Sequence, residues 1–137
     1  MGMVEVEDIK NNSSIPGLIF TGYNGQGQGT AMAKILFGEV NPGGKSSVTW
    51  YKSVDDLPEF GDYTLRGNNE KNGRTYWYFD QPVSYEFGYG LSYTSFEYSD
   101  FAISKKEITP YDKVTVSTYV TNTGTRDGDE IVQVYLV

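Results

Sequence analysis

The stretch AKILFGEVNPGGK, residues 33–45, organises the first half of the chain. Apolar side chains at and just before it recur at i, i+3 and i+4, the stripe of a short amphipathic helix: Met32, Ile35 and Leu36. Gly38 lies where a glycine commonly ends a helix, and Pro42 shortly beyond it forbids continuation. The stretch therefore predicts a helix over residues 30–37 that closes in a sharp turn.

Two apolar segments flank this helix. The segment IPGLIF, residues 15–20, predicts a buried strand, since Pro16 lies near its start, where a missing N–H is tolerated. The segment SSVTWY, residues 46–51, predicts a second strand. A glycine-rich turn over residues 22–29 joins the first strand to the helix. Together these elements predict a βαβ unit with a parallel strand pair and a right-handed crossover.

The glycine-rich turn could also cradle a phosphate group. The dinucleotide fingerprint is G-x-G-x-x-G, whereas Gly25, Gly27 and Gly29 are spaced as G-x-G-x-G, with Thr30 at the position of the last glycine. No lysine follows as it would in a P-loop. We therefore interpret the turn as structural, with nucleotide binding as a distant alternative.

Residues 52–93 lack periodicity but are rich in aromatic side chains. A segment of this length without regular structure indicates either a functional loop system or a surface that packs on a neighbouring domain. Within it, the run RTYWYF, if extended, would place on one side the three candidate substrate-binding residues: Arg74, Tyr76 and Tyr78. Such a face could be a sugar platform, in which rings stack on C–H surfaces and Arg74 donates to hydroxyls. A strand packed between domains is the favoured alternative.

The last part of the chain has the pattern of β-strands. Aromatic and aliphatic residues begin it at Phe96, residues 114–121 alternate apolar and polar side chains, and residues 131–137 place Val132, Val134 and Leu136 on one face. We expect about three strands of an antiparallel β-sandwich, which needs about seven strands to close. Because the edge and the apolar face would lack partners, we expect dimerisation, aggregation or disorder after about residue 96.

Composition excludes several classes of function. The net charge of −7 argues against nucleic-acid binding, and no apolar run approaches the ~20 residues of a membrane span. The chain has no Cys and no His, so thiolate nucleophiles, Ser-His-Asp triads and zinc sites with thiolate or imidazole ligands are excluded within it. The remaining acidic candidates lie close together in a polar loop and are more readily explained by solvation than by catalysis: Asp55, Asp56, Glu59 and Asp62.

Several short motifs follow one another in an order that resembles family 3 glycoside hydrolases. The first motifs resemble the C-terminal α/β domain of that family and the last ones resemble the start of its fibronectin type III-like domain. In order they are Gly25-Gln26, residues 33–45, Asp56-Leu57-Pro58, Asp62-Tyr63, Gly73-Arg74-Thr75-Tyr76, residues 87–93, Asn122-Thr123-Gly124, Gly128-Asp129-Glu130 and residues 132–136. Each motif alone is unspecific, but their common order makes the resemblance extend over residues 15–137.

The resemblance implies a larger enzyme with a (β/α)₈ barrel, an α/β domain and a β-sandwich. Residues 1–95 would be the C-terminal part of the α/β domain, and residues 96–137 the first strands of a truncated fibronectin type III-like domain. In the family the nucleophilic Asp lies on the barrel, and the acid/base Glu, where the second domain supplies it, lies upstream of the GQ turn. Neither motif is present, so we expect no catalytic residue and no activity of the chain alone.

By this resemblance the chain is expected to be a fragment of a retaining, exo-acting β-glucosidase or β-xylosidase. Its partners would be the barrel domain of the same polypeptide and, through the parent enzyme, β-linked glucoside or xyloside oligosaccharides. No cofactor or metal is implied. The alternative is a free-standing, non-catalytic carbohydrate-binding or interaction module. The compartment is left open, with a periplasmic or secreted bacterial parent as one expectation.

Overall fold

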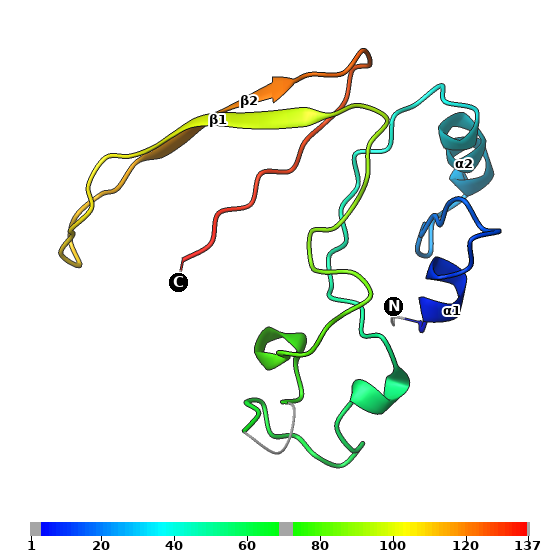
Figure 1. Cartoon of the computed structure of the whole chain (residues 1–137), viewed down its shortest axis with the longest axis horizontal. Helices are drawn as coiled ribbons and strands as arrows, with labels where there is room; N and C mark the ends of the chain where they lie inside the picture. Colours follow the sequence, from blue (N-terminus) through cyan, green and yellow to red (C-terminus); the bar gives the residue numbers. More distant parts are fainter. Residues whose placement is uncertain (1–3, 69–72, 137) are drawn as a thin grey trace. The chain divides into compact units, whose positions relative to one another are not determined.

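The computed structural model describes residues 4–68 and 73–136 (Figure 1). Its regular elements are short: helices α1 (Glu7–Lys10) and α2 (Gln28–Leu36), two 3₁₀ turns (Val54–Asp56 and Tyr76–Tyr78), and strands β1 (Phe96–Ile103) and β2 (Val116–Asn122). The chain divides into two compact units. One consists of Met1–Thr30 and Lys45–Gly90, and the other of Ala31–Gly44 and Leu91–Val137.

Helix α2 confirms the helix predicted from the apolar stripe, although it begins two residues earlier. It ends in a Schellman motif, because the Glu39 amide donates to the Lys34 carbonyl at 2.8 Å and the Gly38 amide donates to the Ile35 carbonyl at 2.9 Å. Gly38 has φ +73°, the left-handed conformation that this motif requires and that favours glycine. The helix therefore stops at the glycine that the sequence indicated.

The two strands expected around α2 do not form, and this part of the βαβ prediction is wrong for the described residues. Residues 15–20 are irregular and their apolar side chains remain largely exposed, including Phe20 at 55%. In residues 46–51 Trp50 forms an isolated antiparallel bridge with Tyr85, and Ser46 exchanges backbone hydrogen bonds with residues 88 and 89, but no strand forms. A strand is stabilised by hydrogen bonds to a neighbouring strand, and no parallel neighbour is present in the part of the chain that the structure describes.

A ring cluster holds the first unit together. Trp50 and Tyr51 are buried, with 5% and 9% of their surface exposed. Trp50 meets Phe20 edge-on at 4.8 Å between ring centroids, and Tyr51 meets Phe79 edge-on at 4.6 Å. These are favourable geometries for aromatic pairs. The loop-rich middle of the chain is thus ordered around two adjacent aromatic residues.

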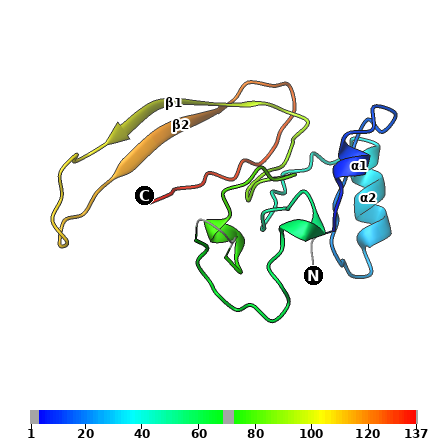
Figure 2. The same ribbon diagram turned by 60° about the horizontal axis from the view of Figure 1, so that its bottom comes forward.

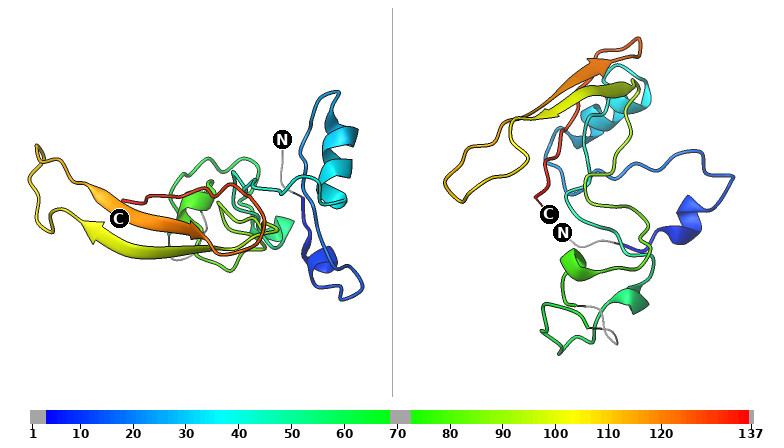
Figure 3. Two further views of the ribbon diagram at one scale, coloured as in Figure 1. Left: turned by 90° about the horizontal axis from the view of Figure 1, so that it is seen from above. Right: turned by 60° about the vertical axis from the view of Figure 1, so that its left-hand side comes forward.

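Strands β1 and β2 form an antiparallel hairpin, and the views in Figures 2 and 3 show them running side by side. The register pairs Phe96 with Asn122 and Ile103 with Val116, with an irregularity between Ser99 and Ala102. These strands confirm the first two predicted from the sequence.

The third predicted strand does not form in the described residues. Residues 131–136 are drawn as an unpaired trace (Figure 2), and Leu136 is fully exposed. Residue 137, the end of that prediction, lies outside the described residues. The structure thus has a two-stranded sheet where three strands of a sandwich were expected, because alternation of side chains alone does not supply a pairing partner. Across residues 4–68 and 73–136, no helix has both the length and the apolar character needed to cross a membrane.

Candidate functional site

Arg74 is the centre of the loop that carries the candidate residues. Its Nη1 atom donates to the backbone carbonyls of Glu59 at 3.0 Å, Phe60 at 3.2 Å and Asp62 at 2.9 Å. The guanidinium carbon lies 4.8 Å from the ring centroid of Tyr63, a cation–π contact. Arg74 therefore holds the loop over residues 59–63 in place. Its Nη1 atom donates to backbone carbonyls, whereas the sequence suggested that Arg74 donates to sugar hydroxyls.

The residue before Arg74 explains how the two loop segments come so close. A Cβ atom on Gly73 would lie 2.3 Å from the Leu65 carbonyl oxygen and 2.7 Å from the Gly67 amide nitrogen. Neither atom is the end of a flexible side chain, so a larger residue would displace the backbone. Next to this contact the Arg74 amide donates to the Thr64 carbonyl at 2.8 Å. A glycine is thus required for Arg74 to reach the 59–63 loop.

Tyr76 and Tyr78 lie on a 3₁₀ turn, so the extended strand predicted for this run is wrong. Successive side chains on such a turn point about 120° apart, which removes the shared face expected from alternation. Tyr78 packs under the Arg66 guanidinium at 5.5 Å, and Tyr76 is half-buried. Trp77 between them is 77% exposed. Arg74 and Tyr78 therefore contact different partners.

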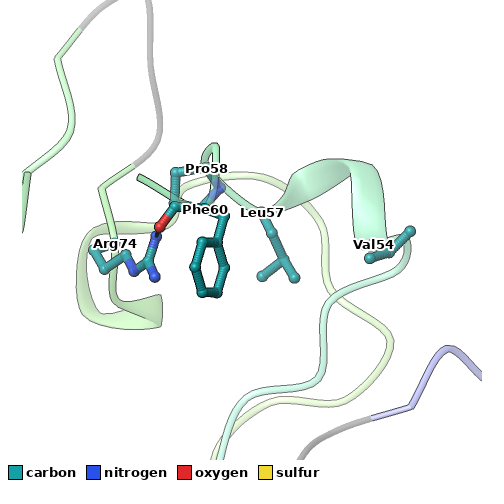
Figure 4. A pocket seen from close by; sticks show the side chains of 5 residues that line it. All are labelled: Val54, Leu57, Pro58, Phe60 and Arg74. Atoms are coloured by element: carbon teal, nitrogen blue, oxygen red, sulfur yellow. Dashed lines mark hydrogen bonds between the residues drawn. The ribbon is translucent and has the colours of Figure 1, made fainter. Parts of the chain in front are cut away.

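An open pocket lies against Arg74 (Figure 4). It has a volume of about 390 Å³, and its walls are mostly apolar: Val54, Leu57, Pro58, Phe60 and Arg74. Figure 4 shows the Phe60 ring standing between the Leu57 side chain and the guanidinium. The ring is 88% exposed. An exposed ring face beside a cation is an arrangement that can stack on an apolar sugar face while the cation lies near its hydroxyls.

The sequence interpretation did not single out the apolar wall of this pocket. Phe60 stands alone between a glutamate and a glycine in a polar loop, so no periodicity draws attention to it. Among the acidic residues nearby, Asp56 has a structural role for its carboxylate. Asp56 accepts from the Ser53 amide at 3.1 Å, and Ser53 accepts from the Asp55 amide at 3.2 Å, which together make a capping box.

Among the described residues, Glu7 and Asp112 have carboxyl groups whose pKa lies below the ordinary value. The Ser84 hydroxyl and the Asn11 amide donate to Glu7 and lower its pKa, aided by the charge of Lys10. Hydrogen bonds from Lys105 and from Thr109 lower the pKa of Asp112. A glycosidase general acid needs a raised pKa, so these two residues have the opposite character.

In the same part of the chain, the pKa values of Tyr51 and Tyr98 are raised. Burial raises the pKa of Tyr51, and burial together with a hydrogen bond to Glu130 raises the pKa of Tyr98. Both phenols therefore stay protonated, and the Tyr98 hydroxyl donates to Glu130 Oε1 at 2.9 Å. Within the described ranges no three or more Asp, Glu, His or Cys side chains gather as metal ligands would.

The family profile of the glycosyl hydrolase family 3 C-terminal domain matches residues 1–93, more than half of the chain. The chain belongs to glycoside hydrolase family 3. Its family 3 relatives include the xylan 1,4-beta-xylosidase of Xylanibacter ruminicola, which is 46% identical over 114 residues, 83% of this chain and 12% of that protein. The periplasmic beta-glucosidase of Salmonella typhimurium is 39% identical over 134 residues, 93% of this chain and 18% of that protein.

A solved structure of a beta-glucosidase is also similar to this chain. Beta-glucosidase 3B from Thermotoga neapolitana, in complex with α-D-glucose, aligns with a TM-score of 0.57 and 33% identity, covering 74% of this chain and 15% of that one. The chain thus spans 12% to 18% of the length of these relatives. The family 3 resemblance drawn from the ordered motifs is confirmed.

Proposed function

We propose that these residues serve a retaining, exo-acting β-glycosidase that removes terminal β-linked glucose or xylose. The observation that carries the proposal is the family 3 match together with relatives named beta-xylosidase and beta-glucosidase at 46% and 39% identity. In this proposal residues 1–95 complete an α/β domain, and residues 96–137 begin a fibronectin type III-like domain. The catalytic carboxylates lie elsewhere in the polypeptide.

The role of the chain in that enzyme is structural and substrate-positioning rather than catalytic. In support, the capping role of Asp56 and the lowered pKa of Glu7 leave neither as a general acid. The partner implied by this role is the barrel domain of the same polypeptide. The exposed aromatic residues of the 54–60 and 76–78 segments would then meet that domain or the sugar at its rim.

Arg74, Tyr76 and Tyr78 remain the proposed substrate-rim residues, in a revised arrangement. Arg74 presents the loop that carries Phe60, because it holds the carbonyls of residues 59, 60 and 62. Tyr78 and the neighbouring Trp77 expose ring surface at 45% and 77%. The rim would thus recognise a sugar mainly by stacking, with Arg74 acting through loop position.

Incubating the chain with 4-nitrophenyl β-glucoside and β-xyloside tests the catalytic part of the proposal. We expect no release of nitrophenol above the buffer control. Turnover that disappears in a carboxylate variant such as Glu59→Gln would place a catalytic residue in the chain and overturn this part.

The second candidate is a non-catalytic carbohydrate-binding module. The exposed ring of Phe60 at the pocket favours it, since a binding face needs no further domain. Titration with xylo- and cello-oligosaccharides, followed by nuclear magnetic resonance, separates the two. Saturable shifts at Phe60, Arg74 and Trp77 would favour the module, whereas unchanged spectra would favour a rim that is completed only by the parent enzyme.

A further inference from the structure

The turn after helix α2 makes contacts that neither the family assignment nor the proposed function explains. Asn41 uses both ends of its side-chain amide. Its Oδ1 atom accepts from the Tyr93 amide at 2.7 Å and from the Ser92 hydroxyl at 3.0 Å, while its Nδ2 atom donates to the Asp127 carbonyl at 2.9 Å. One side chain therefore joins the turn to segments about fifty and ninety residues away.

A second contact ties the same turn to the same segments. The Arg126 Nη1 atom donates to the Gly38 carbonyl at 2.9 Å, and its guanidinium lies 5.7 Å from the ring centroid of Tyr93. The Tyr93 hydroxyl in turn donates to the Ile35 carbonyl at 2.9 Å. The Ile35 carbonyl, which already accepts from the Gly38 amide, and the Gly38 carbonyl just beyond the helix thus each accept from a residue on one side of the hairpin.

Close backbone approach makes the contact surface specific. A Cβ atom on Gly128 would lie 2.5 Å from Asn41 Nδ2, and a Cβ atom on Gly43 would lie 3.2 Å from Asp129 Cβ. The loop over residues 124–130 can therefore approach the turn over residues 38–44 because glycine stands on both sides of the contact. On the hairpin side, the Asn122 amide donates to the Arg126 carbonyl at 2.8 Å and so fixes that loop to the end of β2.

We propose that residues 38–44 are a docking surface for the hairpin module, residues 91–136, and that Asn41 and Arg126 clasp the two into one rigid body. The family match ends at residue 93, so the contacts of Asp127 and Arg126 join a turn inside the matched domain to a segment beyond it. The occupant is the hairpin module of the same chain. The opposite expectation is that residues 91–136 move independently of the turn over residues 38–44.

Distance measurements across this unit test the clasp directly. The chain has no native cysteine, so spin labels can be placed uniquely at Lys34→Cys on α2 and Ser117→Cys on β2, both exposed. Double electron–electron resonance on the full 137-residue chain should give a narrow distance distribution. The variants Asn41→Ala and Arg126→Ala should broaden it, whereas Asn24→Ala, an exposed asparagine outside the clasp, should leave it unchanged.

Amide hydrogen exchange gives an independent measurement. The Tyr93 amide donates to Asn41 itself, so Asn41→Ala should raise its exchange rate about tenfold, while amides of the β1–β2 ladder change less. Asn41→Asp keeps the acceptor but loses the donor to Asp127, so the Tyr93 amide should stay protected while the distance distribution still broadens. A broad distribution in the unaltered chain, or a narrow one in all the variants, overturns the clasp.

Discussion

Replacing Trp50 by alanine should remove the main stabilising contact of the first unit. Trp50 is buried, with 5% of its surface exposed, and its ring centroid lies 4.8 Å from that of Phe20 and 6.4 Å from that of Tyr85. Each edge-on pair contributes about 0.5–1.5 kcal/mol. The indole Nε1 donates to the Ser46 hydroxyl at 3.0 Å, which contributes about 1 kcal/mol more.

These contributions place the loss in the free energy of unfolding near 3 kcal/mol, at the lower end of the about 3–5 kcal/mol seen for tryptophan-to-alanine changes in cores. The lower end is appropriate because Phe20 is itself half exposed and can relax into the cavity. With a urea dependence of about 2 kcal/mol per molar, the midpoint should fall by about 1.5 M. Trp50→Phe keeps the ring contacts but lacks the N–H, so it should cost about 1 kcal/mol.

Urea unfolding followed by near-ultraviolet circular dichroism of the tyrosines measures the change. The matched control is Trp77→Ala, which removes the only other tryptophan from a position 77% exposed and should shift the midpoint very little. Equal destabilisation by the two substitutions would contradict the reasoning, because burial would then not decide the cost. An unchanged midpoint for Trp50→Ala would contradict it as well.

Three further predictions concern other contacts. Gly73→Ala should destabilise the chain by about 1–3 kcal/mol, because its Cβ would displace backbone, and a smaller change in thermal unfolding than that of an exposed Gly17→Ala control would refute the contact. Hydrogen bonds lower the pKa of Glu7 below its ordinary value of 4.5, so the stability they provide is present above that pH and is lost as the pH falls through the folded-state pKa. Urea midpoints across this acidic range should therefore vary less in Ser84→Ala, and an unaltered pH dependence in that variant would count against the contact. Leu136→Lys should reduce self-association measured by sedimentation, because the exposed apolar side chains of Val134 and Leu136 can pack on those of a second copy. An unaltered sedimentation profile would count against that role.

Local signals predicted local structure well. The apolar stripe and Gly38 predicted helix α2 and its end because both the helix and its Schellman motif are made within about ten residues of chain. Aromatic and aliphatic residues from Phe96 predicted β1, and alternation over residues 114–121 predicted β2; the two strands pair as a hairpin of neighbouring segments. The ordered motifs predicted the family because each motif is a short contiguous segment that can be recognised without knowing the fold.

Prediction failed where the outcome depends on distant partners. Residues 15–20 have a strand-like composition but remain irregular, because a strand is stabilised by a neighbour and none lies beside them in the described residues. The run around Tyr76 was expected to be extended but forms a 3₁₀ turn. In this turned form Arg66 lies over the Tyr78 ring and Arg74 lies over the Tyr63 ring. Asn41 gave no sign of its role, since its partners lie at residues 92, 93 and 127.

The sequence by itself therefore determined the helix, its glycine end, two of the three expected strands and the family. Each of these is encoded in contiguous residues whose spacing matches the period of the element or the order of a motif. Only the tertiary structure decided that Arg74 holds a loop and that Asn41 joins the α2 turn to the hairpin. Both are hydrogen-bond arrangements whose donors and acceptors meet only after the chain has folded, and a backbone carbonyl at a distant residue leaves no mark in the sequence that could identify it in advance.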